Sequence, residues 1–309
     1  RALHPTMRQQ QSGACTLVYQ APSPIHTQTH PQKPIVLVHG LASNAMLWEG
    51  AALALCALGH LVTAVELRGH GLSEKPESGY DMQTVTRDLA GVLRELQKDG
   101  FTQPVVCGQS WGGNVVVELA HAHPELVSGV VCVDGGFLEL QNHYPNWDDC
   151  AKALRPPTIT GTRIADFKNY LKRAHPDWPE TGINGAMSCM EHLPDGTLRP
   201  WLNLERHIMV LRGLWEHHPT HIYSQITVPV MFVPAEGVYH YLINSENMAN
   251  QDMIAYTFQK TVIIVSPMSF YAYLQTILHA LKALQVEESI KEVLKKIEIL
   301  GHHLTTYES

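Results

Sequence analysis

The chain has 309 residues, 45% of them hydrophobic, with 22 basic and 29 acidic side chains and a formal charge of −7. A chain of this length buries roughly three quarters of its unfolded surface, which suffices for one large domain or one domain with an insertion. It contains no basic block, so we expect neither nucleic acid nor an anionic membrane as a partner. A small neutral or apolar ligand fits this composition better.

The cysteines and apolar segments favour a cytoplasmic location. None of the six cysteines forms a CxxC motif, and Cys107 and Cys132 lie in apolar, strand-like runs. Such thiols behave as small hydrophobic groups, which favours a reducing compartment. The sequence has no stretch of 18 apolar residues, and residues 1–20 lack the apolar core of a signal peptide.

Short β-rich runs alternate with helical patterns along the chain, and this alternation is typical of a parallel sheet with crossover helices. The predicted strands cover residues 34–38, 61–66, 104–107, 127–133, 228–233 and 261–265. The predicted helices cover residues 46–58, 82–97, 113–121 and 271–284.

The regular spacing is interrupted once, between Gly136 and Gln225. We expect an inserted helical cap over 137–225, and a core formed by 1–136 and 226–285. Since ligands of open α/β sheets bind beyond the carboxyl ends of the strands, a cap that leaves the sheet there would cover the pocket and exclude water. The tryptophans of this segment form either the core of the cap or a pocket wall; they are Trp147, Trp178, Trp201 and Trp215.

Residues 108–112 read Gly-Gln-Ser-Trp-Gly and match the G-x-S-x-G pattern between a predicted strand and a predicted helix. In that context the pattern predicts a nucleophile elbow with Ser110 at its tip. Gly108 and Gly112 supply the small residues that so tight a turn needs. The helix start behind Ser110 would aim unsatisfied N–H groups at an oxyanion, the Trp111 N–H first among them.

Further motifs follow the other predicted strands: His39-Gly40-Leu41, Arg68-Gly69-His70-Gly71-Leu72-Ser73 and Val133-Asp134-Gly135-Gly136. With these motifs, residues 34–284 resemble the α/β-hydrolase superfamily. The resemblance implies an α/β fold, with a mostly parallel central sheet flanked by helices and an inserted helical cap. It also implies that the Leu41 N–H faces the Trp111 N–H as the second donor of an oxyanion hole.

Neither a cofactor nor a metal is expected. The run Gly69-His70-Gly71 suggests a dinucleotide fingerprint, but Glu74 stands where the third glycine would be. His217, His218 and His221 are close in sequence, but Pro219 interrupts the helix that would align them as zinc ligands.

The sequence departs from the family at the acid and the base of the triad. A serine hydrolase of this type carries Ser, Asp or Glu, and His in that chain order. The resemblance puts Val238 at the usual aspartate and Phe270 at the usual histidine. Glu236 and Asp134 are the alternative acids. His240 and His279 are the alternative bases, whereas His39 is expected to shape its own loop.

Aromatic residues gather in the two loops where acid and base would lie, among them Tyr241 and Tyr273. Such side chains bind flat or apolar ligands, although they could equally fill space or belong to a helix core. The candidate substrate-binding residues are Phe137, Trp147, Tyr239, Phe270 and Tyr271.

We therefore expect an enzyme that acts on an apolar ester or thioester through Ser110 and the oxyanion hole, with an atypical or degraded triad. Loss of the base lowers turnover in a serine protease by roughly 10⁶-fold. Two alternatives stay open for this reason. One is a non-hydrolytic cyclase, pericyclase or lyase on the same scaffold, and the other is a ligand-binding or inactivated variant.

Residues 286–309 predict an amphipathic helix and a tail. Apolar residues recur at spacings of four and three, and Glu287 and Lys291 form an i,i+4 pair. Two heptads are too few for a stable free coiled coil, so the helix either docks on its own chain or pairs with a second subunit as a homodimer.

Overall fold

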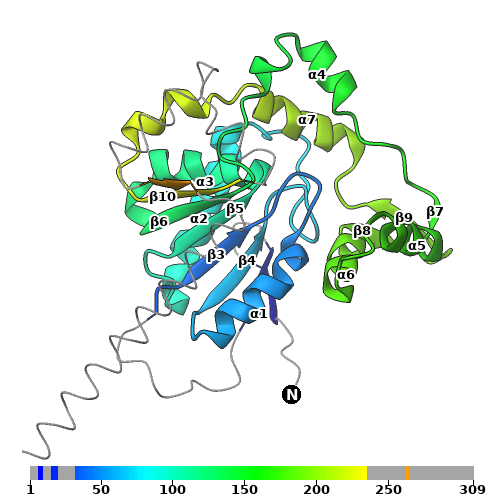
Figure 1. The fold of residues 1–309 in the computed structure, drawn as a ribbon, viewed down its shortest axis with the longest axis horizontal. Coiled ribbons are helices and arrows are strands. Elements are labelled where there is room, and N and C mark those ends of the chain that lie inside the picture. The colour runs from blue at the N-terminus through cyan, green and yellow to red at the C-terminus, as the bar shows by residue number, and fades with distance from the viewer. Residues whose placement is uncertain (1–5, 10–14, 20–31, 235–261, 265–309) are drawn as a thin grey trace, which may run out of the picture. The chain divides into compact units, whose positions relative to one another are not determined.

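The computed structural model describes residues 6–9, 15–19, 32–234 and 262–264. In these residues an eight-stranded sheet has the order β1-β2-β4-β3-β5-β6-β10-β11 (Figure 1). The strands from β4 to β11 in this order are parallel, whereas β1 and β2 are antiparallel to their neighbours. The strands are β1 Thr6–Gln9, β2 Cys15–Tyr19, β3 Ile35–Val38, β4 Val62–Glu66, β5 Val105–Gln109, β6 Gly129–Val133, β10 Val230–Val233 and β11 Val262–Ile264.

Each strand predicted from the sequence is confirmed within a few residues, from β3 to β11. The hairpin of β1 and β2 was not predicted. Its strands read Thr-Met-Arg-Gln and Cys-Thr-Leu-Val-Tyr, without a continuous apolar run. Pairing of β2 with β4 places this hairpin at the sheet edge, where tertiary context outweighs the local pattern.

Successive side chains of β3 point to opposite faces of the sheet, and the helices that they contact show which helix covers which face. Ile35 and Leu37 pack in one cluster with α1 residues, and Val36 and Val38 pack in another with residues of α2 and α3. Helix α1 therefore covers one face, and α2 and α3 cover the other (Figure 1). The helices are α1 Glu49–Ala57, α2 Met82–Leu96 and α3 Trp111–Ala122, with 3₁₀ turns η1 Ala45–Trp48, η2 Gln97–Asp99 and η3 Pro124–Leu126.

Between β6 and β10 the chain forms a long insertion. It contains helices, as predicted, and in addition a three-stranded antiparallel sheet in the order β7-β9-β8. This small sheet was not predicted, although the dipeptide Asp195-Gly196 is typical of a hairpin turn between two strands. In the structure Gly196 has a φ of +81°, and the Asp195 side chain accepts the Thr197 N–H at 2.9 Å. The elements are η4 Leu140–Asn142, α4 Trp147–Ala153, β7 Thr162–Arg163, α5 Ile164–Ala174, α6 Glu180–Ser188, β8 Met190–His192, β9 Thr197–Pro200, α7 Leu204–Trp215, η5 Pro219–His221 and η6 Tyr223–Gln225.

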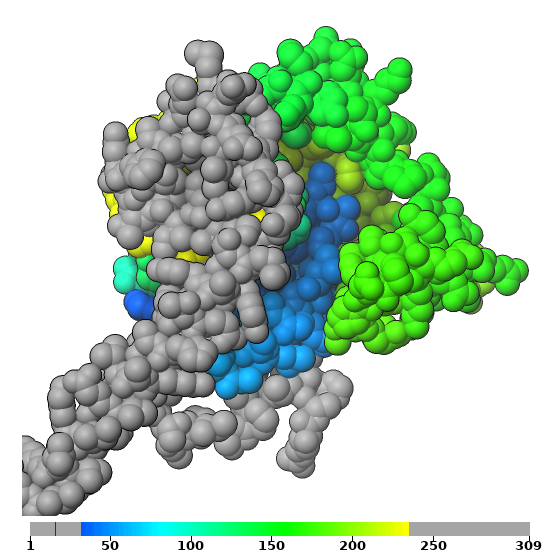
Figure 2. Space-filling view, in the orientation of Figure 1, coloured from blue at the N-terminus to red at the C-terminus, as the bar shows by residue number. Residues whose placement is uncertain are grey.

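The insertion has a small core of its own, formed by Leu171, Ile183, Met187 and Leu198. It also contacts the loop after β3. Helix α6 packs on η1 and α1, where Figure 2 shows the green surface of the insertion against the blue surface of residues 35–57. The Asn44 amide donates to the Ser188 hydroxyl at 2.9 Å in this contact.

The structure bears only in part on the expected location and on the expected homodimer. Five cysteines in the described ranges are free thiols. Among the described helices, none is long and apolar enough to cross a bilayer. The predicted helix 271–284, the amphipathic helix 286–309 and the homodimer that it would form lie outside the described residues.

Candidate active site

Ser110 makes the turn from β5 to α3 by itself, since β5 ends at Gln109 and α3 begins at Trp111. Its backbone has φ +52° and ψ −121°, a conformation that costs a residue with a Cβ of the order of 1–3 kcal/mol. Two hydrogen bonds hold it there. The Ser110 N–H donates to Val133 O at 2.9 Å, and the Gly113 N–H donates to Ser110 O at 2.8 Å.

Backbone segments meet at this turn so closely that only glycine fits. A Cβ on Gly108 would lie 2.2 Å from Gly112 O, and a Cβ on Gly112 would lie 2.3 Å from His39 O. A Cβ on Gly40 would come within 3.2 Å of the Ser110 Cβ. The steric reason given for the two elbow glycines therefore holds, and the loop after β3 lies directly against the elbow.

The topology puts this contact at a switch point of the sheet. Strand β3 lies between β4 and β5, and the chain runs from β3 to β4 on one side and then crosses to β5 on the other. In open α/β sheets the carboxyl ends of two such strands form the crevice in which ligands bind. Leu41 follows β3 and Ser110 follows β5, so both lie at that crevice.

Two backbone N–H groups near the elbow, those of Leu41 and Trp111, have no acceptor among the described residues. The Ala42 N–H donates to His70 Nε2 at 3.2 Å, and the Ser43 N–H donates to Gly40 O at 3.2 Å. Within the described ranges, no hydrogen bond joins the Leu41 or the Trp111 N–H to another residue. These are the two groups that the family resemblance assigns to an oxyanion hole.

His39 and His70 are fully buried and neutral beside Trp111. The His39 Nδ1–H donates to Gly40 O at 2.8 Å while its Nε2 accepts the Leu67 N–H at 3.1 Å. His70 has the same tautomer, because its Nε2 accepts from Ala42 and its Nδ1–H donates to Arg68 O at 2.9 Å. Burial lowers the pKa of His39 to about 4, and burial together with His39 lowers the pKa of His70 well below its usual range. Neither ring has a nitrogen left to accept the Ser110 proton.

Asp134 is the candidate acid that the structure describes. It follows β6 directly, and its N–H donates to Val233 O at 2.8 Å, at the carboxyl end of β10. Because the Ser110 N–H donates to the adjacent Val133 O, Asp134 lies on the strand end next to the elbow. Its φ is +48°, and with Ala42 and Ser110 it is one of three described non-glycine residues that have a positive φ just after a strand at this end of the sheet.

The predicted substrate-binding residues are only partly described. The Phe137 ring lies 6.2 Å from the Phe232 ring and packs against the main core. Trp147 contacts Trp215 at 5.8 Å, and the Arg212 guanidinium lies 4.9 Å and 4.7 Å from the two ring centres. Several predicted site residues lie outside the described residues, namely Glu236, Val238, Tyr239, His240, Phe270, Tyr271 and His279.

A buried polar network that the sequence analysis missed joins both ends of the insertion to α3. Asn114 accepts the Gly136 N–H at 2.9 Å and lies 3.1 Å from His217 Nδ1. His217 Nε2 lies 3.1 Å from Glu118, and this hydrogen bond is the main reason why the pKa of Glu118 is lowered. Asn114 and Glu118 are an i,i+4 polar pair in the mostly apolar helix α3, and that pattern was the available signal.

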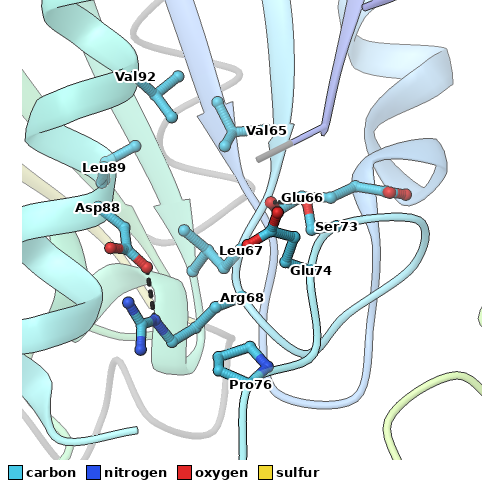
Figure 3. A pocket seen from close by; sticks show the side chains of 10 residues that line it. All are labelled: Val65, Glu66, Leu67, Arg68, Ser73, Glu74, Pro76, Asp88, Leu89 and Val92. Atoms are coloured by element: carbon cyan, nitrogen blue, oxygen red, sulfur yellow. Dashed lines mark hydrogen bonds and ion pairs between the residues drawn. The ribbon is translucent and has the colours of Figure 1, made fainter. Parts of the chain in front are cut away.

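A pocket is present on another part of the sheet and does not include Ser110 (Figure 3). It lies between β4, the loop after β4 and α2. Arg68 and Asp88 form an ion pair across it. Its lining residues are Val65, Glu66, Leu67, Arg68, Ser73, Glu74, Pro76, Asp88, Leu89 and Val92.

Two histidines near the end of the insertion, His217 and His218, are engaged with carboxylates. His218 Nδ1 lies 2.8 Å from Glu139, and its ring stacks on His221 at 5.1 Å. In the part of the chain that the structure covers, no three His, Cys, Asp or Glu side chains are grouped so as to hold a metal ion.

Two family models match the chain. The model described as the α/β-hydrolase fold matches residues 33–177, which contain the elbow and the loops after β3 and β4. A model described as the RmuC family matches residues 202–309. The described part of that second match includes α7 and β10, and β10 pairs with β6 in the central sheet.

Individual proteins agree with the first model. A 2-(acetamidomethylene)succinate hydrolase of Mesorhizobium japonicum is 29% identical over 66% of this chain and 71% of its own. Further curated relatives, among them a soluble epoxide hydrolase of Corynebacterium, are matched over 29% to 39% of their length.

Solved structures share the fold. The crystal structure of an E-2-(acetamidomethylene)succinate hydrolase has a TM-score of 0.67 and 24% identity, covering 89% of this chain and 98% of that one. An esterase structure from Mycobacterium tuberculosis has a TM-score of 0.60 and 20% identity, covering 90% and 92%. The sheet order, the elbow and these similarities agree, and the chain has the α/β-hydrolase fold.

Proposed function

We propose that this chain hydrolyses an apolar ester or thioester, with Ser110 as the nucleophile. The observation that carries the proposal is the pair of N–H groups at Leu41 and Trp111, which flank Ser110 at the switch point without an acceptor in the described residues. In the reaction, Ser110 Oγ attacks the carbonyl carbon and the carbonyl oxygen becomes an oxyanion. Two preorganised donors stabilise that charge most where water is excluded.

Ester and thioester hydrolysis is also the chemistry for which several solved neighbours of the fold are named. One matched protein is a hydrolase of 2-(acetamidomethylene)succinate, and solved neighbours of the fold include esterases and a thioesterase domain. Partly buried apolar side chains follow the strands on either side of β5, namely Leu41 after β3 and Phe137 and Leu138 after β6, and the proposal takes them as walls of the site. An uncharged, apolar acyl group is the substrate that such walls accept best.

The proton of Ser110 needs an acceptor, and the proposal assigns it to a histidine outside the described residues, His240 or His279. His39 and His70 are ruled out because both ring nitrogens of each are engaged. Asp134, at the strand end next to the elbow, is the proposed acid, with Glu236 as the alternative. With a base in an unusual position, we expect slow turnover. The rate should lie between that of an enzyme without its triad, about 10³–10⁴-fold above the reaction in water, and that of an enzyme with an intact triad.

The second candidate is a non-hydrolytic cyclase or lyase on the same scaffold. The engagement of both histidines beside the elbow favours it, because an oxyanion hole can polarise a carbonyl without an acyl-enzyme. The two candidates differ in what Ser110→Ala does. A hydrolase loses all turnover, whereas a cyclase or lyase is only weakened.

The experiment is the intact mass of the full chain after incubation with a fluorophosphonate probe at pH 6 to 9. Wild type is compared with Ser110→Ala and with Ser78→Ala, which removes an exposed hydroxyl away from the elbow. We expect one phosphonyl adduct on wild type and Ser78→Ala and none on Ser110→Ala. Turnover of p-nitrophenyl butyrate and of a butyryl thioester is then measured on the same proteins.

Absence of the adduct on folded wild type would contradict the acyl-enzyme proposal. Ester or thioester turnover that survives Ser110→Ala would show that Ser110 is not the nucleophile in that hydrolysis. A ligand-binding protein would show neither adduct nor turnover.

A further inference from the structure

Three buried side chains join the loop after β3, residues 39–45, to the loop after β4, residues 67–75. His39 accepts the Leu67 N–H, and the Glu66 carboxylate accepts the Leu72 N–H at 2.7 Å and also bonds the Ala45 N–H. His70 provides the third link through Ala42. These links hold the β3 loop against a second loop of the same sheet edge.

Of the three, His70 is the one that reaches both halves of the candidate oxyanion hole from outside the loop after β3. The His39 ring also lies 6.4 Å from the Trp111 ring, but His39 is part of that loop. The His70 Nε2 accepts the N–H of Ala42, the residue after Leu41, at 3.2 Å. Its ring stacks on Trp111, with the ring centres 5.3 Å apart and the planes at 24°. One imidazole therefore contacts the segments that carry both N–H donors.

The orientation of the His70 ring is itself fixed. Its Nδ1–H donates to Arg68 O at 2.9 Å. Arg68 in turn is held by its side chain, which bonds Asp88 on α2 and donates to Gly79 O at 2.8 Å; Figure 3 shows Arg68 facing Asp88. The acceptor nitrogen of His70 thus cannot turn away from Ala42 without breaking the bond to Arg68.

Ala42 needs such support because its φ is +59°, in the left-handed region that is unfavourable for a residue with a Cβ. Residues in such conformations persist where their surroundings hold them. If Ala42 relaxed, the peptide plane between Leu41 and Ala42 would rotate, and the Leu41 N–H on the preceding peptide would change direction with it. The bond from the Ala42 N–H to His70 opposes this rotation.

We propose that His70 is a positioning residue for the oxyanion hole. By holding the Ala42 N–H, it directs the Leu41 N–H toward the carbonyl above Ser110, and by stacking on Trp111 it sets the spacing to the second donor. The inference rests on the proposed function, and it adds a residue that touches no substrate.

Two substitutions separate the parts of this role. In His70→Gln, the amide oxygen reaches the place of Nε2 and can still accept the Ala42 N–H. In His70→Asn, the shorter amide reaches the place of Nδ1 and can donate to Arg68 O, but it leaves the Ala42 N–H without an acceptor. Both remove the ring, so a difference between them reports the contact with Ala42.

The measurements are kcat and KM for p-nitrophenyl butyrate and the rate of Ser110 phosphonylation. Removing one oxyanion donor costs about 10²–10³-fold in kcat, and for a misdirected donor we expect a loss of about 10- to 100-fold in His70→Asn. KM should stay within about two-fold, because the donor acts in the transition state. His70→Gln should recover most of the lost rate. Equal losses in both variants, or a loss confined to KM, would overturn the inference.

Hydrogen exchange of the peptide that contains Ala42 tests the same contact without any activity. We expect its amides to exchange faster in His70→Asn than in wild type and His70→Gln, while peptides from α2 are unchanged. If wild type fails to react at Ser110, the proposed function fails, and this exchange difference still decides the role of His70. No difference between the variants would reject it.

Discussion

The loops around Ser110 and the insertion between β6 and β10 are held in different ways. Around Ser110, backbone packs on backbone, and His39, His70 and Trp111 are at most 1% exposed. The insertion has a small core, and it exposes large side chains such as Tyr170, at 57%, and Trp178, at 43%. The difference indicates that the geometry of the candidate site is fixed by the sheet, while the insertion can vary without disturbing it.

The largest effect should come from adding a methyl group to the elbow. In Gly112→Ala the new Cβ would meet His39 O at 2.3 Å, so the backbone must shift. We expect the free energy of unfolding to fall by more than about 3 kcal/mol, which is more than overpacked substitutions usually cost. Urea denaturation followed by tryptophan fluorescence measures it.

Gly91→Ala is the matched control, because a Cβ at this position in α2 meets nothing within 4 Å. It should stabilise the protein by about 0.5–1 kcal/mol. A Gly112→Ala variant as stable as this control would show that the elbow is not closely packed.

A cavity in the insertion should have a strong but local effect. Leu198 is fully buried in the small core, and Leu198→Ala should cost that core about 3 kcal/mol. We expect faster hydrogen exchange in α5, α6 and β9, with exchange in β5 and α3 unchanged. The rate of Ser110 phosphonylation should change less than about two-fold, within the usual independence of distant sites. Faster exchange at the elbow as well would remove the distinction between the two regions.

Acid should weaken the elbow through its neutral histidines. The pKa of His39 is about 4 in the folded protein and 6.5 as its ordinary value, so the unfolded chain binds more protons between these values. The contribution of His39 to the free energy of unfolding is therefore complete above pH 6.5. It is lost as the pH falls toward 4, and the total loss is about 3 kcal/mol. His70 contributes in the same direction.

The test compares urea unfolding at pH 7.5 and pH 5 for wild type and His39→Gln. The variant should lose part of the pH dependence, whatever its stability at pH 7.5. An identical pH dependence in both proteins would mean that His39 is not buried as a neutral ring.

The smallest effect should come from one hydrogen bond between the insertion and the core. The Tyr223 hydroxyl of η6 donates to Gly136 O at 2.8 Å and so joins the two ends of the insertion. Tyr223→Phe removes this donor, and we expect a loss of about 1 kcal/mol in the free energy of unfolding. A loss as large as that of Gly112→Ala would show that the insertion is tied to the sheet more firmly than its contacts indicate.

Much of the elbow could be predicted from the sequence because its cause is local. The glycines at 108 and 112, the strand before Ser110 and the helix after it lie within one short segment. The part that the loop after β3 plays beside the elbow was predicted from the family resemblance. The proposed role of His70 was missed, because its partners Ala42 and Trp111 are distant in sequence. Residues 68–73 were read as a family motif and weighed as a nucleotide motif, without a role for the His70 side chain.

The insertion was harder to predict for the same reason. Its helices have amphipathic patterns, but the strands β7, β8 and β9 are two to four residues long and form only by pairing with one another. Asn114, Glu118 and His217 are joined across the fold, so their network has little local signal. The acid and base of the proposed reaction remain predictions, since most of their candidates lie outside the described residues.

The pairing of β6 with β10 has a consequence for how the protein is made. Strand β6 is synthesised before the insertion, and its partner β10 only after it. During synthesis, one edge of β6 therefore stays unpaired until the whole insertion and β10 have been made. An uncovered, apolar edge can pair with another chain, so the order of synthesis exposes this protein to aggregation at β6, the strand that Asp134 follows.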